Sequence, residues 1–345
     1  MALEILSLTK DLDQFGGAQK VLMDIHRGIK NEYNAKVLGF SKFSDLHAKY
    51  NIDKSEYVKF KNPFYLNNKL LIVHDRRIIT FIMALKRLFF LNTKILYVSH
   101  CVYDSLNWAS LFPTDIVSIS GKVSDNLINY FQLKERNIRL IYNGIKDDDN
   151  TDLTYNKKKS NKIIILYAAR VYGLKRQLEI VNNLANKLAP EIEIHFAGTG
   201  PDYQELVDKC KQSPNFKTLG FIENISELIN KVDYLMLFSE REGLPISLIE
   251  GTMHGKPLLA NDVGGNLEIC VPGENGFLLE ENWECIADTL NALVTLPEDE
   301  YLRMSKNSRK RYECMFTYET MVSRYIDVIN QMQQNTVSIF ANSSI

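Results

Sequence analysis

In the stretch SEREGLPISLIEGTMHGKPLLANDVGG, residues 239–265, two of the glutamates, Glu242 and Glu250, are separated by seven residues. The apolar run 233–238 before it predicts a buried strand, so Glu242 falls in the loop at the carboxyl end of that strand. Pro245 suits the first turn of a helix, because its missing N–H has no intrahelical partner there. Glu250 then lies about a turn and a half into this helix. The stretch therefore predicts two carboxylates that reach one ligand from two elements.

These two carboxylates have two interpretations. Taken alone, Glu242 or Glu250 is more often a solvated surface residue, since charged side chains are mostly exposed. Beside a helix start, whose free backbone N–H groups attract anions, the pair instead fits a ligand that carries phosphate and hydroxyl groups. Carboxylates accept hydrogen bonds from hydroxyls, so the expected contact is the sugar part of such a ligand.

Outside this stretch, short apolar runs alternate with amphipathic ones along most of the chain. Such alternation predicts parallel sheets with helices on both faces. The predicted strands are 3–8, 35–40, 70–75, 94–100, 115–120, 137–144, 162–170, 191–198, 233–239, 256–262 and 276–280. The predicted helices are 18–29, 122–131, 175–188, 226–232 and 246–255, with more between about 283 and 334. Residues after 335 are expected to fray.

The length of 345 residues favours two domains. The stretch 146–161 is polar, charged and without periodicity, which predicts a linker. We expect an N-terminal domain at 1–145, a C-terminal domain at 162–320, and a last helix and tail at 321–345 that could pack back on the first domain. Two doubly wound domains are expected to leave a cleft, and ligands bind beyond the carboxyl ends of parallel strands.

Two cations follow the first strand of the predicted second domain. Arg170 ends that strand, and Lys175 opens the next helix five residues later. A planar guanidinium and a compact ammonium at one strand end suit a diphosphate. The alternative is a pair of surface cations, although cations near a helix start oppose its dipole unless an anion is present.

Glycines and histidines follow other predicted strands. Gly198 begins a Gly-Thr-Gly turn, which alone is weak evidence for a nucleotide site because such turns are common. Gly16 and Gly17 follow the first strand, where they either let the backbone approach a ligand or form a plain turn. His100 and His74 each end a strand. We prefer His100 as the active-site residue, although a lone histidine is often structural.

The segment 242–279 resembles the E-x7-E signature of retaining GT-B glycosyltransferases of the family 4 type. Glu242 and Glu250 match the two glutamates, and PGENGFLL (272–279) matches the segment after the signature. Further matching residues are Gly243, Gly255, Pro257, Gly264, Gly265 and Glu268. The resemblance covers most of the chain, and its most specific motifs begin at Arg170. It implies an α/β fold of the GT-B type, in which two Rossmann-like doubly wound domains face each other across a cleft.

The resemblance also implies roles for residues by position. Glu242 would contact the donor sugar, and Glu250 the ribose of the nucleotide. Arg170 and Lys175 match a G-R-x4-K motif that holds the donor diphosphate, although Ala169 stands where glycine is common. His100 corresponds to a histidine near the donor sugar. The other implied donor-binding residues are Gly16, Gly17, Gly198, Phe221, Ile222, Gly243, Leu244 and Pro245.

The implied activity is that of a retaining glycosyltransferase. It would move a hexosyl or N-acetylhexosaminyl group from a UDP- or GDP-sugar to a hydroxyl of a glycan or lipid-linked saccharide, in bacterial surface polysaccharide synthesis. No cofactor and no metal are implied, and Asp147–Asp149 is interpreted as a solvated charge run. Two alternatives stay open: a nucleotide-sugar epimerase or phosphorylase of the same fold, and a non-catalytic GT-B subunit that binds glycan.

Composition restricts the partners and the compartment. Acidic and basic residues nearly cancel, at 42 against 41, so no nucleic-acid partner is expected. Five scattered cysteines without a CxxC pair favour free thiols in a reducing compartment, and no leader is expected at the N-terminus, which favours the cytoplasm. The segment 75–90 is basic and apolar, so it could contact the anionic inner face of the cell membrane; a core helix with two exposed cations is the alternative.

Overall fold

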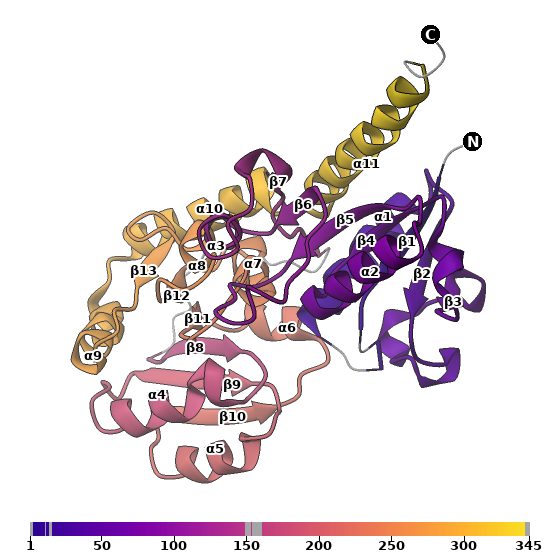
Figure 1. The fold of residues 1–345 in the computed structure, drawn as a ribbon. Helices are drawn as coiled ribbons and strands as arrows, with labels where there is room; N and C mark the ends of the chain where they lie inside the picture. The colour runs from indigo at the N-terminus through magenta and orange to yellow at the C-terminus, as the bar shows by residue number, and fades with distance from the viewer. Residues whose placement is uncertain (1–2, 11, 14–15, 149–152, 154–160, 342–345) are drawn as a thin grey trace. The chain divides into compact units, whose positions relative to one another are not determined.

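The structure is a computed structural model that describes residues 3–10, 12–13, 16–148, 153 and 161–341. It consists of two compact units (Figure 1). Unit 1 comprises Met1–Gly144 together with Tyr318–Ile345, and unit 2 comprises Ile145–Thr317. The chain thus passes from unit 1 into unit 2 once and returns once. Most of the predicted linker at 146–161 lies outside the described residues.

Unit 1 is built on a seven-stranded sheet in the order β3-β2-β1-β4-β5-β6-β7, in which all neighbouring strands are parallel. The strand order reverses between β1 and β4, so the carboxyl ends of these strands flank a topological switch point. The strands β1, β4 and β5 are buried almost throughout, as expected of a sheet covered on both faces. The strands are β1 (Glu4–Leu8), β2 (Ala35–Gly39), β3 (Tyr57–Lys59), β4 (Lys69–Val73), β5 (Lys94–Ser99), β6 (Asp115–Ser118) and β7 (Ile138–Leu140).

Four α-helices belong to the described part of unit 1: α1 (Gly17–Ile29), α2 (Arg76–Leu88), α3 (Gly121–Asn129) and α11 (Tyr318–Ala341). Side-chain caps fix where two of them begin. The carboxylate of Asp75 accepts hydrogen bonds from the first N–H groups of α2, and the Ser120 hydroxyl accepts one from Val123 in α3.

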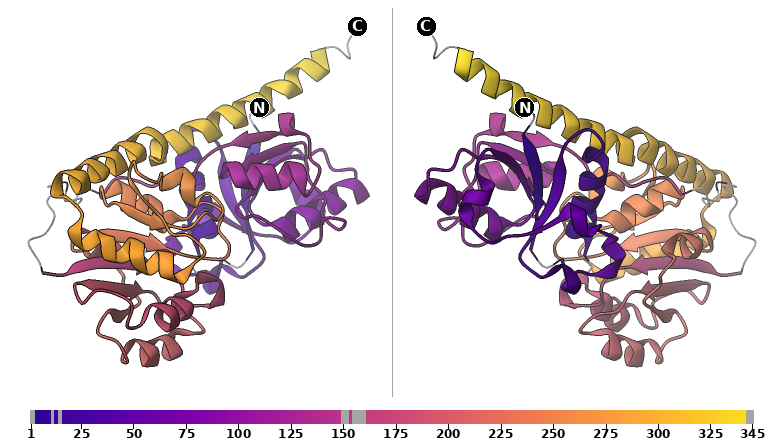
Figure 2. Two further views of the ribbon diagram at one scale, coloured as in Figure 1. Left: turned by 90° about the vertical axis from the view of Figure 1, so that its left-hand side faces the viewer. Right: turned by 90° about the vertical axis from the view of Figure 1, so that its right-hand side faces the viewer.

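The last helix packs tightly on the first. A Cβ placed on Gly28 of α1 would lie 2.4 Å from Cγ2 of Val322 in α11, so the two helices meet with no room for a side chain at this point. The predicted fraying after residue 335 is wrong in extent, because α11 continues to Ala341 beyond the sheet of unit 1 (Figure 2). No Pro or Gly interrupts the chain between Tyr318 and Ala341.

Unit 2 carries a six-stranded parallel sheet in the order β10-β9-β8-β11-β12-β13. Its switch point lies between β8 and β11. The strands are β8 (Ile163–Ala168), β9 (Ile192–Ala197), β10 (Phe216–Gly220), β11 (Tyr234–Leu237), β12 (Leu258–Ala260) and β13 (Gly276–Leu278). The helices are α4 (Gln177–Leu184), α5 (Tyr203–Cys210), α6 (Ile225–Asn230), α7 (Ile246–Met253), α8 (Asn266–Ile269), α9 (Trp283–Ala292) and α10 (Glu298–Met315).

Two helix starts in unit 2 differ from the prediction. The helix expected from 175 begins at Gln177, because residues Gly173–Lys175 form a separate 3₁₀ turn and Arg176 adopts a left-handed conformation with φ 53°. Pro245 occupies the N-cap position just before α7, where its backbone is extended, rather than the first turn. The helix α4 therefore begins two residues later than predicted, whereas α7 begins at the predicted residue 246 and only the position of Pro245 differs.

Candidate functional site

The carboxyl ends of β8 and β11 lie side by side at the switch point of unit 2. The loop after β8 carries Arg170 and Lys175, and the loop after β11 carries Glu242. Ligands of doubly wound sheets bind at this position, outside the carboxyl ends of the strands. The fold therefore brings the residues predicted for the diphosphate and for the sugar to the same end of two neighbouring strands.

Lys175 and Glu242 form an ion pair, in which Lys175 Nζ donates to Glu242 Oε1. Only 8% of Glu242 is exposed, so it is not a solvated loop residue. A carboxylate at this depth requires a partner to offset its lost hydration, and the ammonium of Lys175 supplies it. The result is a cation and a carboxylate in direct contact at the end of the sheet.

The hydroxyl of Tyr167 connects the loops that carry this pair. It lies in β8, fully buried, within 2.7 Å of the Lys175 carbonyl oxygen and 2.9 Å of the Phe238 carbonyl oxygen, and it accepts from the Phe238 N–H at 3.1 Å. Because Phe238 begins the loop after β11, one hydroxyl holds the backbone of both loops.

A second network lies beside Tyr167. Arg176 donates to Glu281 at 2.6 Å and stacks its guanidinium 4.4 Å from the centre of the Phe238 ring. Glu281 also accepts from Asn261 at 2.9 Å, and the Asn261 amide donates to the Ser239 carbonyl at 2.8 Å. These contacts tie the start of α4 to the loop that carries Glu242. The sequence analysis did not predict a role for Arg176, Asn261 or Glu281. The sequence shows two adjacent cations at 175 and 176, but its pattern does not indicate which of them pairs with Glu281.

Two glycines permit close backbone packing around the site. Gly264 has φ 54°, and a Cβ there would lie 2.3 Å from the Glu242 carbonyl oxygen. Gly198 has φ 134°, and a Cβ there would lie 2.1 Å from the Ala169 carbonyl oxygen. Both positions therefore require glycine for contact with a neighbouring loop. For Gly198, this packing explains the Gly-Thr-Gly turn without reference to a ligand.

Arg170 is exposed near the start of the loop after β8. Its guanidinium lies 5.9 Å from the centre of the Tyr172 ring, and among the described residues it has no ion-pair partner. Arg170 thus differs from Lys175, whose charge is matched by Glu242.

The other candidates of unit 2 lie around this centre. Gly243, Leu244 and Pro245 are buried between Glu242 and α7, and Glu250 is a half-buried residue of α7. Phe221 is exposed and Ile222 half-buried, directly after β10. In the sheet, β9 lies between β10 and β8.

In unit 1, His74 and His100 form a contact with each other. They follow the neighbouring strands β4 and β5, with 2.7 Å between His74 Nδ1 and His100 Nε2 and ring planes 24° apart. Burial lowers the pKa of His100 to about 4, and burial together with the charge of His100 lowers the pKa of His74 well below its usual value. Both rings are therefore neutral at pH 7, and one donates to the other. His74 and His100, which the sequence analysis treated as alternatives, therefore form a hydrogen-bonded pair.

The glycines of the first loop have no packing requirement. Gly16 is the extended N-cap of α1 and Gly17 is the first residue of the helix. A Cβ on Gly17 would meet nothing within 4 Å, and one on Gly16 would meet the flexible end of Gln19. Residues 14–15, which precede them, lie outside the described residues.

No group of three His, Cys, Asp or Glu side chains that could hold a metal ion occurs in the described part of the chain. Of the acidic run Asp147–Asp149, Asp149 is not among the described residues. Asp147 is not simply solvated as predicted, because it accepts from Arg309, and this hydrogen bond lowers the pKa of its carboxyl.

Each of the two units carries a doubly wound parallel sheet, and the chain has the GT-B fold of solved glycosyltransferase structures. Residues 148–311 match the family model described as glycosyl transferases group 1. The protein is a glycosyltransferase that uses a nucleotide-sugar donor, related to enzymes of O-antigen and capsule biosynthesis.

Several known proteins resemble this chain. The O-antigen biosynthesis glycosyltransferase WbnH of Escherichia coli is 26% identical over 344 residues, which cover 92% of this chain and 96% of WbnH. The capsular polysaccharide biosynthesis glycosyltransferase CapH of Staphylococcus aureus is 28% identical, over 46% of either chain. The structure of Anabaena Alr3699/HepE in complex with UDP has the same fold, with a TM-score of 0.78, 18% identity, and coverage of 96% of this chain and all of that one.

Proposed function

We propose that this glycosyltransferase transfers a hexosyl or N-acetylhexosaminyl group from a UDP-sugar to a hydroxyl of a saccharide acceptor, with retention of the anomeric configuration. The observation that carries the proposal is the contact between Lys175 and Glu242. In a nucleotide sugar, the sugar is bonded directly to the distal phosphate. A cation for that phosphate and a carboxylate for a sugar hydroxyl must therefore lie side by side, as these two residues do.

The diphosphate leaves with negative charge, and this charge requires stabilisation. Lys175 and the exposed Arg170 follow the same strand and supply two positive charges. The first backbone N–H groups of α7 add donors that lack intrahelical partners. Glu242 accepts hydrogen bonds from the sugar hydroxyls and so fixes the sugar relative to the cations.

The proposed reaction is a same-face substitution. The bond between the anomeric carbon and the diphosphate oxygen breaks, and the acceptor oxygen bonds to that carbon on the same face. The acceptor proton moves to the departing diphosphate oxygen, so the products are the nucleoside diphosphate and the glycoside. Glu242 is assigned to positioning the sugar, since its carboxylate is engaged by Lys175.

Further donor contacts are proposed from the resemblance to the family. Glu250, half-buried in α7, would accept from the ribose hydroxyls. The exposed ring of Phe221 and the adjacent Ile222 would meet the base. We also propose His100 of unit 1 as a substrate-binding residue that acts as a neutral hydrogen-bond donor or acceptor, since its pKa is about 4. Gly16 and Gly17 would allow a close approach of the backbone.

The relatives support a choice of donor and pathway. The HepE structure contains UDP, which favours UDP over GDP for this chain. WbnH acts in O-antigen biosynthesis, which favours an acceptor of a bacterial surface polysaccharide and a cytoplasmic location for the reaction. A panel of UDP- and GDP-sugars, assayed for nucleotide release, tests the choice of donor; release from GDP-sugars alone would overturn it.

Substitution of the ion pair tests the site. We expect Lys175→Ala and Glu242→Ala each to lower kcat by about 100-fold or more, because each removes a group that acts on the donor. Lys187→Ala is the matched control: Lys187 forms an exposed pair with Glu284 at 2.6 Å in the same unit, away from the end of the sheet. Near-normal turnover in both site variants, with folding intact, would reject the assignment.

A further inference from the structure

One proton lies between the two histidines of unit 1, in the contact that joins His74 Nδ1 and His100 Nε2 at 2.7 Å. A neutral imidazole has one nitrogen that donates a hydrogen bond and one that accepts. Two arrangements therefore exist. Either His74 donates from Nδ1 and His100 carries its own proton on Nδ1, or His100 donates from Nε2 and His74 carries its own proton on Nε2.

The surroundings of His74 distinguish these arrangements. His74 is 5% exposed, and its Nε2 is buried without a hydrogen-bond partner among the described residues. Buried N–H groups without an acceptor are rarer in folded proteins than buried acceptors without a donor, and each unpartnered group loses its hydrogen bonds to water. The proton of His74 therefore belongs on Nδ1, where His100 Nε2 accepts it.

This arrangement also determines the state of His100. Because its Nε2 accepts from His74, its own proton lies on Nδ1. His100 is half-buried, and its Nδ1 has no hydrogen-bond partner among the described residues; unlike His74 Nε2, this atom is not sealed from solvent. His100 follows β5, so its free N–H lies at the carboxyl end of the sheet, where ligands of doubly wound folds bind.

We propose that His74 is a positioning residue, which fixes His100 in the tautomer with the proton on Nδ1, so that His100 offers the substrate a hydrogen-bond donor and not an acceptor. The group that fits this donor is an oxygen acceptor such as a sugar hydroxyl. That hydroxyl would turn a lone pair toward His100 and keep its own proton for another acceptor. The contact of His100 with substrate rests on the proposed function, whereas the tautomer does not.

The position of His74 is fixed by its backbone and by its ring. Its backbone N–H donates to the Leu8 carbonyl of β1 at 3.0 Å. Its ring stacks on that of His100, with centroids 5.0 Å apart and planes 24° apart. A hydrogen bond from such a supporting residue sets both the tautomer and the orientation of the ring that it contacts. Phenylalanine has a similar ring without nitrogens, so a substitution can separate the packing from the hydrogen bond.

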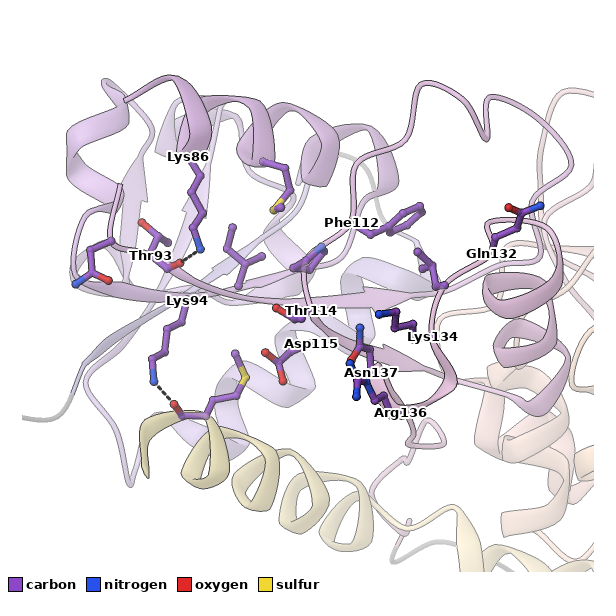
Figure 3. A pocket seen from close by; sticks show the side chains of 16 residues that line it. Lys86, Thr93, Lys94, Phe112, Thr114, Asp115, Gln132, Lys134, Arg136 and Asn137 are labelled. Atoms are coloured by element: carbon purple, nitrogen blue, oxygen red, sulfur yellow. Dashed lines mark hydrogen bonds between the residues drawn. The ribbon is translucent and has the colours of Figure 1, made fainter. Parts of the chain in front are cut away.

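A second place in unit 1 where a ligand could enter lies at the far end of β5. It is a pocket of about 810 Å³ at the amino ends of β5 and β6, and Lys134 and Arg136 reach it from the loop after α3 (Figure 3). Lys86 of α2 also lines it, and neither α2 nor any other helix in the described part of the chain combines the length and the apolar character needed to cross a bilayer. The six residues of β5 span about 20 Å, so a ligand in this pocket would not touch His100.

NMR of the full chain, labelled with [15N]histidine and recorded at pH 7, reads the tautomers directly, because protonated and unprotonated ring nitrogens differ in chemical shift. The variants His74→Phe and His100→Asn each remove the signals of one residue and so assign them. We expect both His74 and His100 to carry the proton on Nδ1. A proton on Nε2 of either residue would overturn the proposal. No substrate is present, so this result stands even if the protein turns over no UDP-sugar and the proposed function fails.

Two neutral amide variants test whether the substrate meets Nδ1 of His100. The amide of asparagine lies at the place of Nδ1, whereas that of glutamine lies at the place of Nε2. We expect His100→Asn to keep kcat/KM for nucleotide release within about threefold of the parent value. His100→Gln should lower it about tenfold, the effect of one lost hydrogen bond. Equal losses in the two variants, at parent melting temperatures, would show that Nδ1 does not contact the substrate and would refute that part of the proposal.

Substitution of His74 separates positioning from packing. We expect His74→Phe to lower kcat/KM about threefold to tenfold, because it keeps a ring but removes the N–H that holds His100. His74→Asn packs less well but has an amide N–H at the place of Nδ1, so it should recover most of this loss. The opposite order, with His74→Phe more active than His74→Asn, would mean that His74 acts by packing alone and would contradict its positioning role.

Two control variants accompany these substitutions. His26→Phe replaces another fully buried histidine of the same unit by the same residue, and Lys134→Gln changes an exposed residue at the far end of β5. Both should keep the parent kcat/KM and the parent signals of His74 and His100. A loss in His26→Phe as large as that in His74→Phe would show that any buried substitution in unit 1 has this effect, and the inference would fall.

Discussion

The hydroxyl of Tyr167 shows how far the proposed donor site depends on a buried residue that touches no ligand. It bonds the backbone of the loop that carries Lys175 and of the loop that carries Glu242. Without it, a carbonyl or N–H of each loop loses its partner in the interior, which costs about 1–3 kcal/mol. The loops could then shift relative to each other.

We therefore expect Tyr167→Phe to lower both stability and kcat, the latter by about tenfold to 100-fold, because small displacements of catalytic groups are costly. Tyr234→Phe is the control: this hydroxyl is also buried in the sheet of unit 2 but has no hydrogen-bond partner among the described residues. Its removal should leave kcat and melting temperature unchanged. The same response in both variants would contradict the role of Tyr167.

The histidine pair predicts a dependence of stability on pH. The unfolded chain protonates His74 and His100 near pH 6.5, whereas in the folded unit burial lowers the pKa of His100 to about 4 and that of His74 well below its usual value. Between these values the unfolded state binds more protons, so stability falls as the pH falls. One such histidine costs about 2 kcal/mol on going from pH 7 to pH 5.

Urea unfolding of the parent protein and of His74→Leu at pH 7 and pH 5 measures this effect. The variant should lose about 2 kcal/mol less than the parent over this interval. His26 and His254 have lowered pKa values too, so part of the acid sensitivity should remain in the variant. If the parent protein and the variant lose the same free energy of unfolding between pH 7 and pH 5, His74 is protonated in the folded protein at pH 5.

At the scale of elements, the alternating pattern predicted most of the two sheets. The strands that end at Leu8, Ala168 and Leu237 lie within their predicted ranges, and this placed Glu242 in the correct loop. Lys175 was predicted to open a helix, but it lies in a 3₁₀ turn before α4. The strands β3 and β10 were not predicted. Both lie at sheet edges, where one side of a short strand faces solvent and the apolar signal is weak.

Contacts between elements could not be predicted from the same pattern. The partner of Lys175, the left-handed backbone of Arg176 and the contact between His74 and His100 each depend on how neighbouring loops meet. Strand order and loop conformation decide these, and periodicity carries no information about either. The resemblance to a family supplied candidate residues, but only the fold showed that two of them bond to each other.

The packing of α1 on α11 gives a prediction at this scale. We expect Gly28→Leu to destabilise unit 1 by about 1–3 kcal/mol, because the new side chain would overlap Val322 and force the helices apart. Gly17→Leu, in the same helix, adds a side chain where nothing lies within 4 Å and should be close to neutral. Denaturant unfolding of the two variants measures this difference. Equal free energies of unfolding would show that α11 can move away from α1 without loss of stability.

At the scale of the whole molecule, we expect UDP to bind to unit 2 and to stabilise that unit. A ligand that binds only the folded state stabilises it by about 2.7 kcal/mol at 100 times its Kd. We expect hydrogen exchange with saturating UDP to slow in the loops after β8 and β11, where Arg170, Lys175 and Glu242 lie. The segment 88–90 of unit 1 should exchange as before. Protection confined to unit 1 would contradict the assignment of the donor site to unit 2.

The discontinuity of unit 1 has a consequence for its biosynthesis. Its sheet is complete when the ribosome reaches Gly144, but Met321, Tyr325 and Ile329 of α11, all buried, come from the end of the chain. Unit 2, Ile145–Thr317, is made in between, and at about 5–20 residues per second its synthesis takes roughly 10–35 s. During that time nascent unit 1 displays the apolar side of α1 without its cover. Unit 2 can fold co-translationally, because it is one continuous segment. Unit 1 can complete its fold only after α11 has been synthesised, so it is the part of the nascent chain that a chaperone would have to protect.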